Sequence, residues 1–428
     1  MPAPRPTLTY HLYSLAARGV APLAWRSVSR KLRDHGVSED RCRERLGHAT
    51  KPRPEGQLVW FHAASVGESL SILTLINRMG QRLPQAEFLI TSGTATSAEL
   101  IAKRMPARTR HQFAPLDAPG PVGRFLDHWK PDAGIFVESE LWPVTLARCP
   151  APLALLNARL SASSVQGWKK RPDTARFVLG QFRLMLTQNA ATADNLIAMG
   201  ADPDRVRSGV NLKSTSDPLP VDTATLAELQ TALGDRPVWV ASSTHEGEEQ
   251  PVLDAHKRLL ESHPDLCLLL VPRHPERGDA VEALVREAGL TCVRRSKREA
   301  LDGQQVYLAD TLGEVGTWYA ASPIVFLGGS LKPIGGHNPF EPAQAGAAVA
   351  SGPHVTNFAE TFTPLIAAGG AVEVEDAGRL AGVVAHWLDD SRALEARRKA
   401  AKDFAEGQQS ALNGIIESLI EALELDHA

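Results

Sequence analysis

The chain has 428 residues, of which 43% are hydrophobic and 22% are charged, a composition typical of a globular protein with a sizeable core. Its length predicts two or three domains, and its formal net charge of −3 argues against nucleic acid as a partner. The four cysteines lie far apart without a C-x-x-C pair, which is typical of reduced, cytosolic thiols rather than of disulfides or zinc ligands.

The first 35 residues combine apolar and basic side chains. Arg18 and Pro22 interrupt the apolar stretch "LTYHLYSLAARGVAPLAWRSV", whereas a spanning helix needs about 20 largely uncharged residues. Arg30, Lys31 and Arg33 follow without an acid among them. This pattern fits a helix that lies in a membrane interface, and it fits an amphipathic helix packed on its own domain equally well. No small-residue cleavage site follows an apolar run, so we expect no secretory signal.

Short apolar runs alternate with helical segments along the rest of the chain. In the first half they are "LVWFHAA", "EFLITS", "HQFAPL", "AGIFVES", "LALLNA" and "LMLTQ", and in the second half they are "PVWVASS", "LCLLLVPR", "QVYLAD", "IVFLGG" and "AAVASG". Unbroken apolar runs separated by helices are typical of parallel sheets covered on both faces. The polar, proline-bearing stretch "STSDPLPVDTATLAELQTALGDRP" separates the two sets and marks a domain boundary.

These patterns predict two doubly wound, Rossmann-like α/β domains that face each other across a cleft. We place a membrane-associating segment at 1–35, the first domain at 36–213, a linker at 214–236, and the second domain with the C-terminal helices at 237–428. Such domains bind ligands at the carboxyl ends of their strands, and the pair is the architecture of GT-B type nucleotide-sugar glycosyltransferases. A pair like that of periplasmic binding proteins shares it, so the fold alone leaves the function open.

Charged side chains follow several strands of the first half. Glu68 lies in the first turn of the helix after "HAASVGES", where an acid complements the helix dipole by about 0.3–1 kcal/mol or serves as a general base. "VESELWP" places Glu138 and Glu140 at the end of an apolar strand, where a buried carboxylate needs partners. Lys213 ends "GVNLK" and alone carries no signal, because surface lysines are the rule.

Comparable polar groups follow the strands of the second half. "LLLVPRHPER" places Arg273 at a strand end, where arginine suits a phosphate or a carboxylate. "DTLGEVGTWY" offers backbone N–H groups around Gly313, with Glu314 beside them. "ASSTHEGEE" carries a capping pattern from Ser243 to Glu246, so capping explains part of that motif.

The stretch "LGGSLKPIGGHNPFEP" at 327–342 is rich in glycine and proline. Such clusters are most often simple loops. Here, however, paired glycines after a strand let a ligand approach the backbone closely. Asn338 as N-cap and Pro339 as first helical residue predict a helix whose free N–H groups suit an anion.

The chain shows no serine or cysteine nucleophile beside a base, and it contains no H-E-x-x-H motif and no clustered His and Cys ligands. We therefore expect no metal and no cofactor. This favours a transfer reaction in which backbone groups, helix dipoles and cations stabilise a leaving phosphate.

Nine motifs in order resemble one known family. They are "WFHAASVGES", "VESELWP", "NARLS", "NLK", "STHEGEE", "VPRHPER", "LGEVGTWY", "GGSLKPIGGHNPFEP" and "GPHVTNF". Together they resemble the 3-deoxy-D-manno-oct-2-ulosonic acid (Kdo) transferases of lipopolysaccharide biosynthesis, from about residue 40 to the C-terminal helices. The resemblance implies an inverting, metal-independent GT-B enzyme that moves Kdo from CMP-Kdo to a lipid A precursor, lipid IVA, at the cytoplasmic face of the cell inner membrane.

The resemblance also implies roles for individual residues. Glu68 matches the family's catalytic base, on the acceptor-binding first domain, and Glu138 and Lys213 match its transition-state-stabilising pair. The CMP contacts match a further set in the second domain: Pro272, Arg273, Leu312, Gly313, Glu314, Asn338, Pro339, Phe340 and Glu341.

Two departures from the family pattern concern the lipid. A basic residue usually follows "ARLS", where this chain reads "ASSVQGW", and the first residues are less apolar than a typical anchor. Two other hypotheses remain at this stage: another GT-B transferase or epimerase acting on a nucleotide sugar, and a nucleotide-sugar sensor without turnover. The sequence leaves the oligomeric state open.

Overall fold

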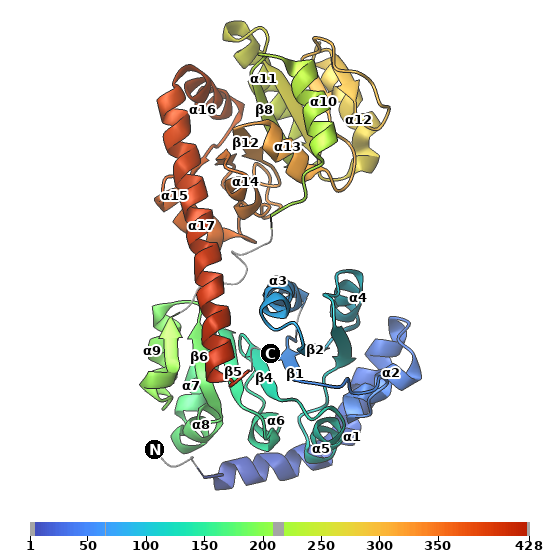
Figure 1. The fold of residues 1–428 in the computed structure, drawn as a ribbon, viewed down its shortest axis with the longest axis vertical. Coiled ribbons are helices and arrows are strands. Elements are labelled where there is room, and N and C mark those ends of the chain that lie inside the picture. The colour runs from blue at the N-terminus through green and yellow to red at the C-terminus, as the bar shows by residue number, and fades with distance from the viewer. Residues whose placement is uncertain (1–4, 65, 209–217, 426–428) are drawn as a thin grey trace. The chain divides into compact units, whose positions relative to one another are not determined.

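The structure, a computed structural model, describes residues 5–64, 66–208 and 218–425. The chain divides into two compact units (Figure 1), of which unit 1 comprises Met1–Leu212 with Ser410–Ala428 and unit 2 comprises Lys213–Gln409. Each unit is built around a parallel sheet with helices between successive strands. The prediction of two doubly wound α/β domains is therefore confirmed.

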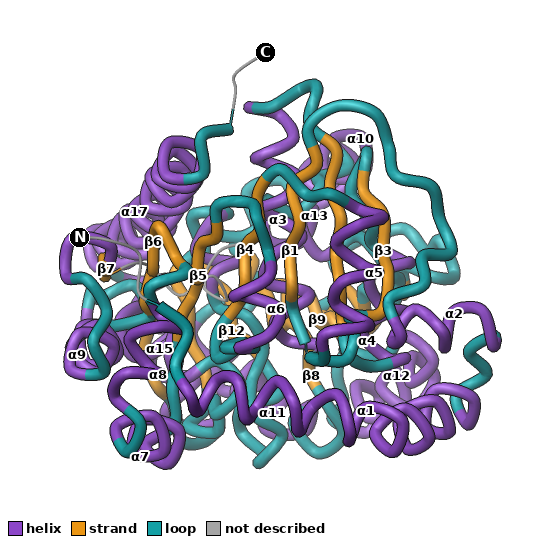
Figure 2. The backbone as a smooth tube through the Cα atoms, turned by 90° about the horizontal axis from the view of Figure 1, so that it is seen from below, coloured by secondary structure: helices purple, strands orange, loops and turns teal. Residues whose placement is uncertain are grey.

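Unit 1 contains, within the described residues, a seven-stranded parallel sheet in the order β3-β2-β1-β4-β5-β6-β7. Figure 2 shows its strands side by side. The strands are β1 (Leu58–His62), β2 (Glu87–Ser92), β3 (Thr109–Phe113), β4 (Ala133–Val137), β5 (Leu153–Ala158), β6 (Phe182–Thr187) and β7 (Val206–Ser208). The strand order reverses direction between β1 and β4, which makes the carboxyl ends of these two strands the topological switch point of the sheet.

The helices of unit 1 cover both faces of this sheet. They are α1 (Leu8–Asp34), α2 (Glu39–Arg43), α3 (Val66–Arg82), α4 (Ala95–Lys103), α5 (Pro119–Trp129), α6 (Pro143–Arg148), α7 (Ala162–Lys169), α8 (Pro172–Leu179) and α9 (Ala190–Ala198), with short 3-10 turns η1 (Glu44–Leu46) and η2 (Pro203–Arg205). Strand residues such as Val59, Phe61 and Ile135 are fully buried against the helices.

Unit 2 repeats this design with a second seven-stranded parallel sheet among its described residues, in the order β10-β11-β9-β8-β12-β13-β14. The strands are β8 (Val238–Thr244), β9 (Cys267–Pro272), β10 (Cys292–Arg294), β11 (Val306–Leu308), β12 (Ile324–Leu327), β13 (Ala348–Ser351) and β14 (Ala371–Glu373). Its switch point lies between β8 and β12.

The helices of unit 2 are α10 (Thr223–Leu233), α11 (Glu249–Ser262), α12 (Gly278–Glu287), α13 (Val315–Ala321), α14 (Phe340–Gln344), α15 (Ala359–Ala367) and α16 (Ala377–Asp389), with the 3-10 turn η4 (Pro275–Arg277). The expected linker at 214–236 is thus wrong in part. Helix α10 buries Leu229 and Leu233 in a cluster with Trp318 and Tyr319, so it belongs to the core of unit 2.

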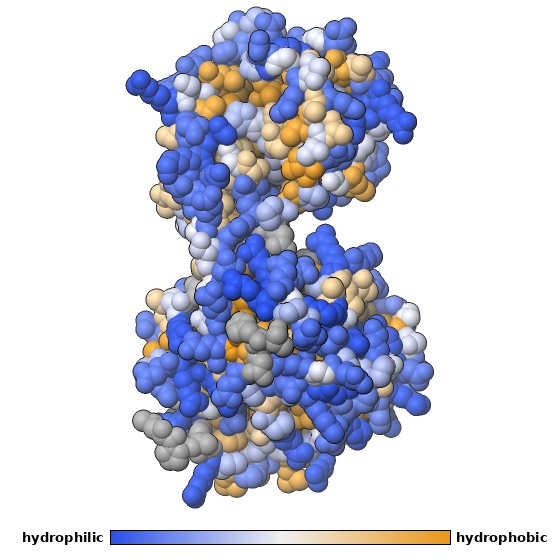
Figure 3. Space-filling view, in the orientation of Figure 1, coloured by the Kyte–Doolittle hydropathy of each residue, from blue (hydrophilic) through white to orange (hydrophobic). Residues whose placement is uncertain are grey.

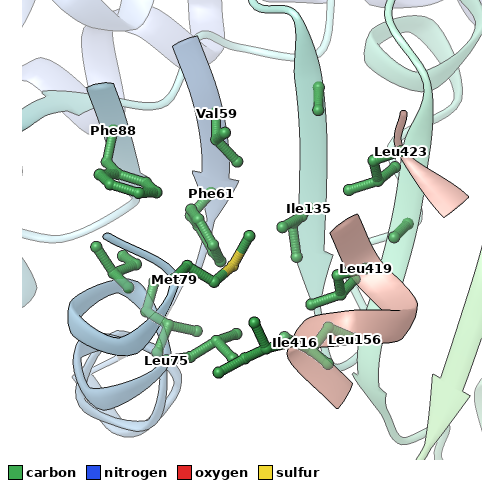
Figure 4. Close-up of a cluster of buried hydrophobic side chains, with 14 of the residues drawn as sticks. Val59, Phe61, Leu75, Met79, Phe88, Ile135, Leu156, Ile416, Leu419 and Leu423 are labelled. Atoms are coloured by element: carbon green, nitrogen blue, oxygen red, sulfur yellow. The ribbon is translucent and has the colours of Figure 1, made fainter. Parts of the chain in front are cut away.

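Helix α17 (Ser391–Ala422) contributes to both units. Ala401 and Ala405 pack in a cluster of unit 2, whereas Ile416, Leu419 and other residues beyond 409 are buried against the sheet of unit 1. Figure 4 shows Ile416, Leu419 and Leu423 facing Ile135 and Leu156 in this cluster. The assignment of all C-terminal helices to the second domain was therefore wrong for the described residues from 410 onward.

Helix α1 packs on unit 1 through Tyr10 and Leu32, which are 8% and 3% exposed. The ring of Tyr10 meets Phe177 of α8 edge-on at 4.9 Å between centroids. Much of the remaining apolar surface is open to solvent, and Leu8 and Leu15 are 75% and 67% exposed. Figure 3 shows apolar atoms among polar ones along the lower edge, where Figure 1 draws α1. Among the described residues, no helix is long and apolar enough to cross a membrane.

Candidate active site

The predicted site residues that the structure describes lie at the carboxyl ends of the two sheets. We call residues 62–64, 66–68, 92–93, 113–117 and 138–142 the unit 1 edge. We call residues 243–248, 272–274, 310–314 and 328–341 the unit 2 edge. Each edge borders the switch point of its own sheet, where open α/β sheets bind ligands.

Glu68 follows β1 in the first turn of α3, as predicted. Its side chain is 8% exposed, and its Oε2 accepts a hydrogen bond of 2.8 Å from the backbone N–H of Ala64. This bond fixes the carboxylate against the turn that leaves the strand. A positioned carboxylate at a strand end is suited to accept a proton from an alcohol.

Glu138 immediately follows β4 and has a left-handed backbone, with φ at 59°. Its N–H donates to the carbonyl of Leu156 over 2.9 Å, so the strained residue is tied to the neighbouring strand. A non-glycine residue in this region costs free energy, and such residues concentrate at functional sites. The conformation turns Glu138 out of the strand beside the switch point. The third predicted catalytic residue, Lys213, lies outside the described residues.

Glu140 ends a buried chain of hydrogen bonds that the sequence did not predict. Trp60 Nε1–H donates to Thr91 Oγ1 over 2.8 Å, Thr91 Oγ1 lies 2.9 Å from His62 Nδ1, and His62 Nε2 lies 3.0 Å from Glu140 Oε2. Trp142 Nε1–H donates to the same oxygen. A carboxylate only accepts, so His62 donates from Nε2 to Glu140.

These hydrogen bonds keep the Glu140 carboxylate negatively charged. Burial tends to raise the pKa of its carboxyl, but the hydrogen bonds from His62 and Trp142 outweigh burial and hold the pKa below its usual range. The result is a buried anion two residues from Glu138. The sequence could show that both acids follow a strand, but not that Glu140 meets a histidine from β1.

A cavity of about 110 Å³ lies at the unit 1 edge. Its described lining comes from the ends of β1, β2, β3 and β4 and from the turns beside them: Arg45, Trp60, His62, Ala64, Gly93, Ala114, Pro115, Leu116, Asp117, Phe136, Trp142 and Thr145. Most of these side chains are apolar. Glu68 is one hydrogen bond away from this lining, because Ala64 lines the cavity and its N–H donates to the Glu68 carboxylate.

The unit 2 edge is organised by Glu248, which is fully buried. Its Oε2 accepts the N–H groups of His245 and Gly329 over 3.0 and 2.6 Å. Its Oε1 accepts those of Ser330 and Leu331, each over 2.8 Å. One carboxylate therefore ties the turn after β8 to the glycine-rich loop after β12, across the switch point. The expected cap, Glu246, is exposed instead, and α11 starts only at Glu249.

Three histidines gather beside this anchor. His245 and His337 stack with their ring planes 11° apart and their Nε2 atoms 2.9 Å apart. His274 meets the His245 ring edge-on, with the ring centroids 5.5 Å apart. Burial lowers the pKa of His245 and lowers that of His337 to about 4. Gly329 has φ at 68°, and a Cβ there would lie 2.8 Å from the His337 ring, so glycine is required beside the pair.

Of the predicted residues, Pro272 ends β9 and Arg273 follows it directly. Pro272 is buried, whereas the Arg273 side chain is exposed and its N–H donates to the carbonyl of Thr244 over 3.0 Å. The following turn is held by an ion pair of 2.5 Å between Arg277 and the buried Glu249. The motifs "VPRHPER" and "STHEGEE" therefore lie against each other, with Arg273 left accessible.

The segment 312–314 is ordered around an ion pair. Arg295 binds the Glu314 carboxylate with two nitrogens, at 2.6 and 3.3 Å, and the Thr311 hydroxyl donates to the same carboxylate. Burial tends to raise the Glu314 pKa, but these bonds outweigh it and lower the pKa. Leu312 is 78% exposed and Gly313 has φ at 85°. The Glu314 carboxylate is therefore already bonded within the protein. The accessible polar groups of this turn are those of its backbone.

The loop after β12 differs slightly from the prediction. Pro339 rather than Asn338 caps helix α14, although Asn338 Oδ1 still accepts the N–H of Phe340 over 3.1 Å. The Phe340 side chain is fully buried in the core, so it cannot face a ligand. Glu341 lies in the first turn and is half-buried.

No group of three or more His, Cys, Asp and Glu side chains is placed to hold a metal ion in the part of the chain that the structure describes. The four cysteines are unpaired thiols, and Cys42 and Cys267 are buried.

Comparison with known proteins adds three findings. Residues 40–216 match the family model described as 3-Deoxy-D-manno-octulosonic-acid transferase (kdotransferase). A probable mitochondrial 3-deoxy-D-manno-octulosonic acid transferase of Arabidopsis thaliana is 35% identical over 94% of this chain and 93% of its own. The 3-deoxy-D-manno-octulosonic acid transferase of Bordetella pertussis is also 35% identical, over 96% of this chain and 98% of its own.

Among solved structures, a glycosyltransferase from Rickettsia africae covers 87% of this chain and 100% of its own with a TM-score of 0.54 and 13% identity. This likeness concerns the fold alone and agrees with the two Rossmann-like units. The two relatives match nearly the whole chain at a level of identity that establishes common descent. The chain belongs to the 3-deoxy-D-manno-octulosonic acid (Kdo) transferase family of glycosyltransferases.

Proposed function

We propose that this protein transfers Kdo from CMP-Kdo to a lipid A precursor, lipid IVA, in lipopolysaccharide biosynthesis. CMP is released, the anomeric configuration inverts and no metal ion takes part. The observation that carries the proposal is the placement of Glu68 and Glu138 beside one switch point, and of the residues expected to bind CMP at the carboxyl edge of the second sheet. Membership of the Kdo transferase family supports the sugar that is moved.

In the proposed reaction the acceptor hydroxyl oxygen forms a bond to the anomeric carbon of Kdo. The bond from that carbon to the CMP phosphate oxygen breaks, and its electron pair leaves with CMP. Glu68 accepts the hydroxyl proton. Glu138 stabilises the positive charge that develops on the sugar, and Lys213 holds the sugar carboxylate or the departing phosphate.

The unit 2 edge supplies the proposed CMP site. Arg273 is accessible for the phosphate, and Glu341 is proposed to accept hydrogen bonds from the ribose hydroxyls. Pro272, Leu312, Gly313, Glu314, Asn338, Pro339 and Phe340 complete the site. For Glu314 and Phe340 we assign the contact to the backbone. The Glu314 carboxylate is bonded to Arg295, and the Phe340 side chain is buried in the core.

The test is incubation with CMP-Kdo and lipid IVA, followed by mass analysis of the lipid. The proposal predicts a mass increase of one or more Kdo residues, unchanged activity after chelator treatment, and an inverted anomeric centre by NMR. Transfer only from a different nucleotide sugar would favour another GT-B enzyme. Tight CMP-Kdo binding without turnover would favour a sensor.

We also propose that α1 holds the protein on the cytoplasmic face of the inner membrane. Leu8, Leu12, Leu15 and Leu23 are 58–75% exposed, and Arg30 and other cations share the helix, each worth about 1 kcal/mol near anionic lipid. Because Tyr10 and Leu32 are buried in unit 1, substitution is a cleaner test than deletion. Serine at the four leucines should abolish flotation with anionic vesicles, whereas Ile366→Ser in unit 2 should not. If high salt leaves vesicle binding unchanged, the result would contradict an electrostatic attachment to the membrane surface.

A further inference from the structure

The cavity at the unit 1 edge contains a cation that the protein does not neutralise. Arg45 lines it from the turn η1. Its Nη1 donates to the carbonyl of Ala114, but its Nε is buried and has no hydrogen-bond partner among the described residues. Burial lowers the pKa of the guanidinium to about 10, so it remains charged at neutral pH. A buried donor without a partner is costly unless a ligand supplies one.

The neighbouring carboxylates are all engaged elsewhere. Asp117, the acid in the described lining, accepts hydrogen bonds from the N–H of Val144, from the N–H and hydroxyl of Thr145, and from the hydroxyl of Tyr13. Glu44 accepts the N–H of Phe113 over 2.8 Å and pairs with Arg41 rather than Arg45. Among the described residues, no ion pair joins Arg45 to an acid within 4.0 Å. The positive charge therefore faces the cavity unpaired.

The place of this charge relates it to the proposed chemistry. Ala64 lines the cavity beside Arg45 and donates to the Glu68 carboxylate over 2.8 Å. Trp60 and Phe136 supply apolar walls, which strengthen a charge-assisted hydrogen bond by excluding water. Arginine is also the side chain whose planar donors best match the oxygens of phosphate or carboxylate.

We infer that this cavity is an acceptor subsite in which Arg45 binds an anionic substituent, phosphate or carboxylate, of the sugar whose hydroxyl faces Glu68. This inference rests on the proposed function. It adds a specificity-determining residue: Arg45 selects acceptors that carry a negative group at a fixed distance from the reacting hydroxyl. The site lies in unit 1 and is separate from the predicted CMP contacts, all of which lie in unit 2.

The first experiment compares Arg45→Gln, Arg45→Lys and Arg124→Gln. Arg124 is the matched control, because it donates two hydrogen bonds to the carbonyl of Leu46 in the same turn without lining this cavity. Arg45→Gln should raise the KM for lipid IVA about 10- to 100-fold, the usual effect of losing a charged hydrogen bond. The KM for CMP-Kdo should not change, Arg45→Lys should recover part of the loss, and Arg124→Gln should behave like wild type.

The second experiment varies the acceptor. If phosphate is the bound group, the acceptor KM of wild type should rise on phosphatase-treated lipid to the value of Arg45→Gln. The variant itself should have the same KM for treated and untreated lipid. If carboxylate is the bound group, the discrimination should appear instead between lipids with and without a Kdo residue already attached. Equal acceptor KM values for wild type and Arg45→Gln on all these lipids would overturn the inference. A raised KM for CMP-Kdo alone would also overturn it and would assign Arg45 to the donor sugar.

A binding measurement separates this inference from the proposed function. With saturating CMP to occupy the donor site, inorganic phosphate should raise the midpoint of thermal unfolding of wild type and of Arg124→Gln, but not of Arg45→Gln. If wild type transfers no Kdo, the proposed function fails while this shift still tests the anion site. If Kdo is transferred and no Arg45-dependent shift or KM effect is seen, the anion site fails alone.

Discussion

The two sheets have closely similar layouts, yet their carboxyl edges are built differently. At the unit 2 edge and beside it, three carboxylates are bonded inside the protein, Glu248 to four backbone N–H groups, Glu249 to Arg277 and Glu314 to Arg295, while the Arg273 side chain is exposed. At the unit 1 edge a mostly apolar cavity contains Arg45, whose Nε has no partner among the described residues.

This difference fits two kinds of ligand. Loops that are tied down before the ligand arrives lose little conformational entropy on binding, which suits a small polar nucleotide. A small apolar cavity with a cation that lacks one hydrogen-bond partner suits part of an amphipathic molecule, one that provides both an apolar contact and an anion. The four predictions below test how far each edge depends on its own groups.

The largest effect is expected from Glu248→Ala in unit 2. Four buried N–H groups lose their acceptor, and each such loss costs about 1–3 kcal/mol before water or relaxation compensates part of it. We expect a loss of about 4 kcal/mol in the free energy of unfolding, together with weaker CMP binding. Chemical unfolding and calorimetry would measure both. Glu246→Ala, in the same turn but exposed, should change stability by less than about 0.5 kcal/mol.

The second prediction concerns catalysis at the unit 1 edge. Glu68→Gln keeps an oxygen to accept the N–H of Ala64 but removes the base, so kcat should fall about 100-fold or more. CMP affinity should stay nearly unchanged, because the predicted nucleotide contacts belong to unit 2. Steady-state kinetics and CMP titration would show this split. A parallel loss of CMP affinity and kcat would instead make Glu68 a structural residue.

The third prediction returns to unit 2. Glu341→Ala should weaken CMP binding by about 1.5–3 kcal/mol, because a charged acceptor of ribose hydroxyls is lost. Calorimetric titration would measure the change, with the exposed Glu375→Ala as a control in the same unit. If the folded variant binds CMP as tightly as wild type, the glycine-rich loop is a connecting loop without a nucleotide contact from Glu341.

The effect that is smallest near neutral pH, and that grows on acidification, is a pH dependence carried by a neutral buried histidine in each unit. Burial lowers the pKa of His111 in unit 1 to about 3 and that of His256 in unit 2 to about 4. Unfolded histidine takes up a proton near pH 6.5. Below that value the unfolded state binds more protons than the folded state, so stability falls as pH falls.

Each of these histidines should lower the free energy of unfolding by about 1.4 kcal/mol per pH unit between pH 6.5 and its folded pKa. His256 accepts from Trp239 Nε1 and lies 3.1 Å from the carbonyl of Gln305, two bonds that glutamine can also make. His256→Gln should therefore flatten the pH dependence of unit 2. An unchanged slope would show that other groups cause it.

The sequence predicted the features that depend on local pattern. Apolar runs predicted eleven of the fourteen described strands, but missed the three-residue edge strands β7, β10 and β14. Polar motifs at the strand ends placed Glu68 and Glu138 at the unit 1 edge. It could not choose Glu248 over Glu246 in "HEGEE", because the partner Gly329 is 81 residues away. Arg45 escaped notice for the same reason: nothing in its neighbourhood marks it, and only the folded sheet brings strand ends around it. Helix α10 was predicted to be part of the linker because the prolines that flank it and its own polar residues outweighed Leu229 and Leu233.

Helix α17 has a consequence for how the protein is made. Ile416, Leu419 and their neighbours complete the core of unit 1, yet they are translated after all of unit 2. While unit 2 is being synthesised, Val59, Phe61 and Ile135 of unit 1 therefore remain partly exposed, because the C-terminal residues that bury them have not yet been made. A premature stop near residue 410 would spare unit 2 and leave unit 1 with an open apolar face, a target for chaperones and proteases.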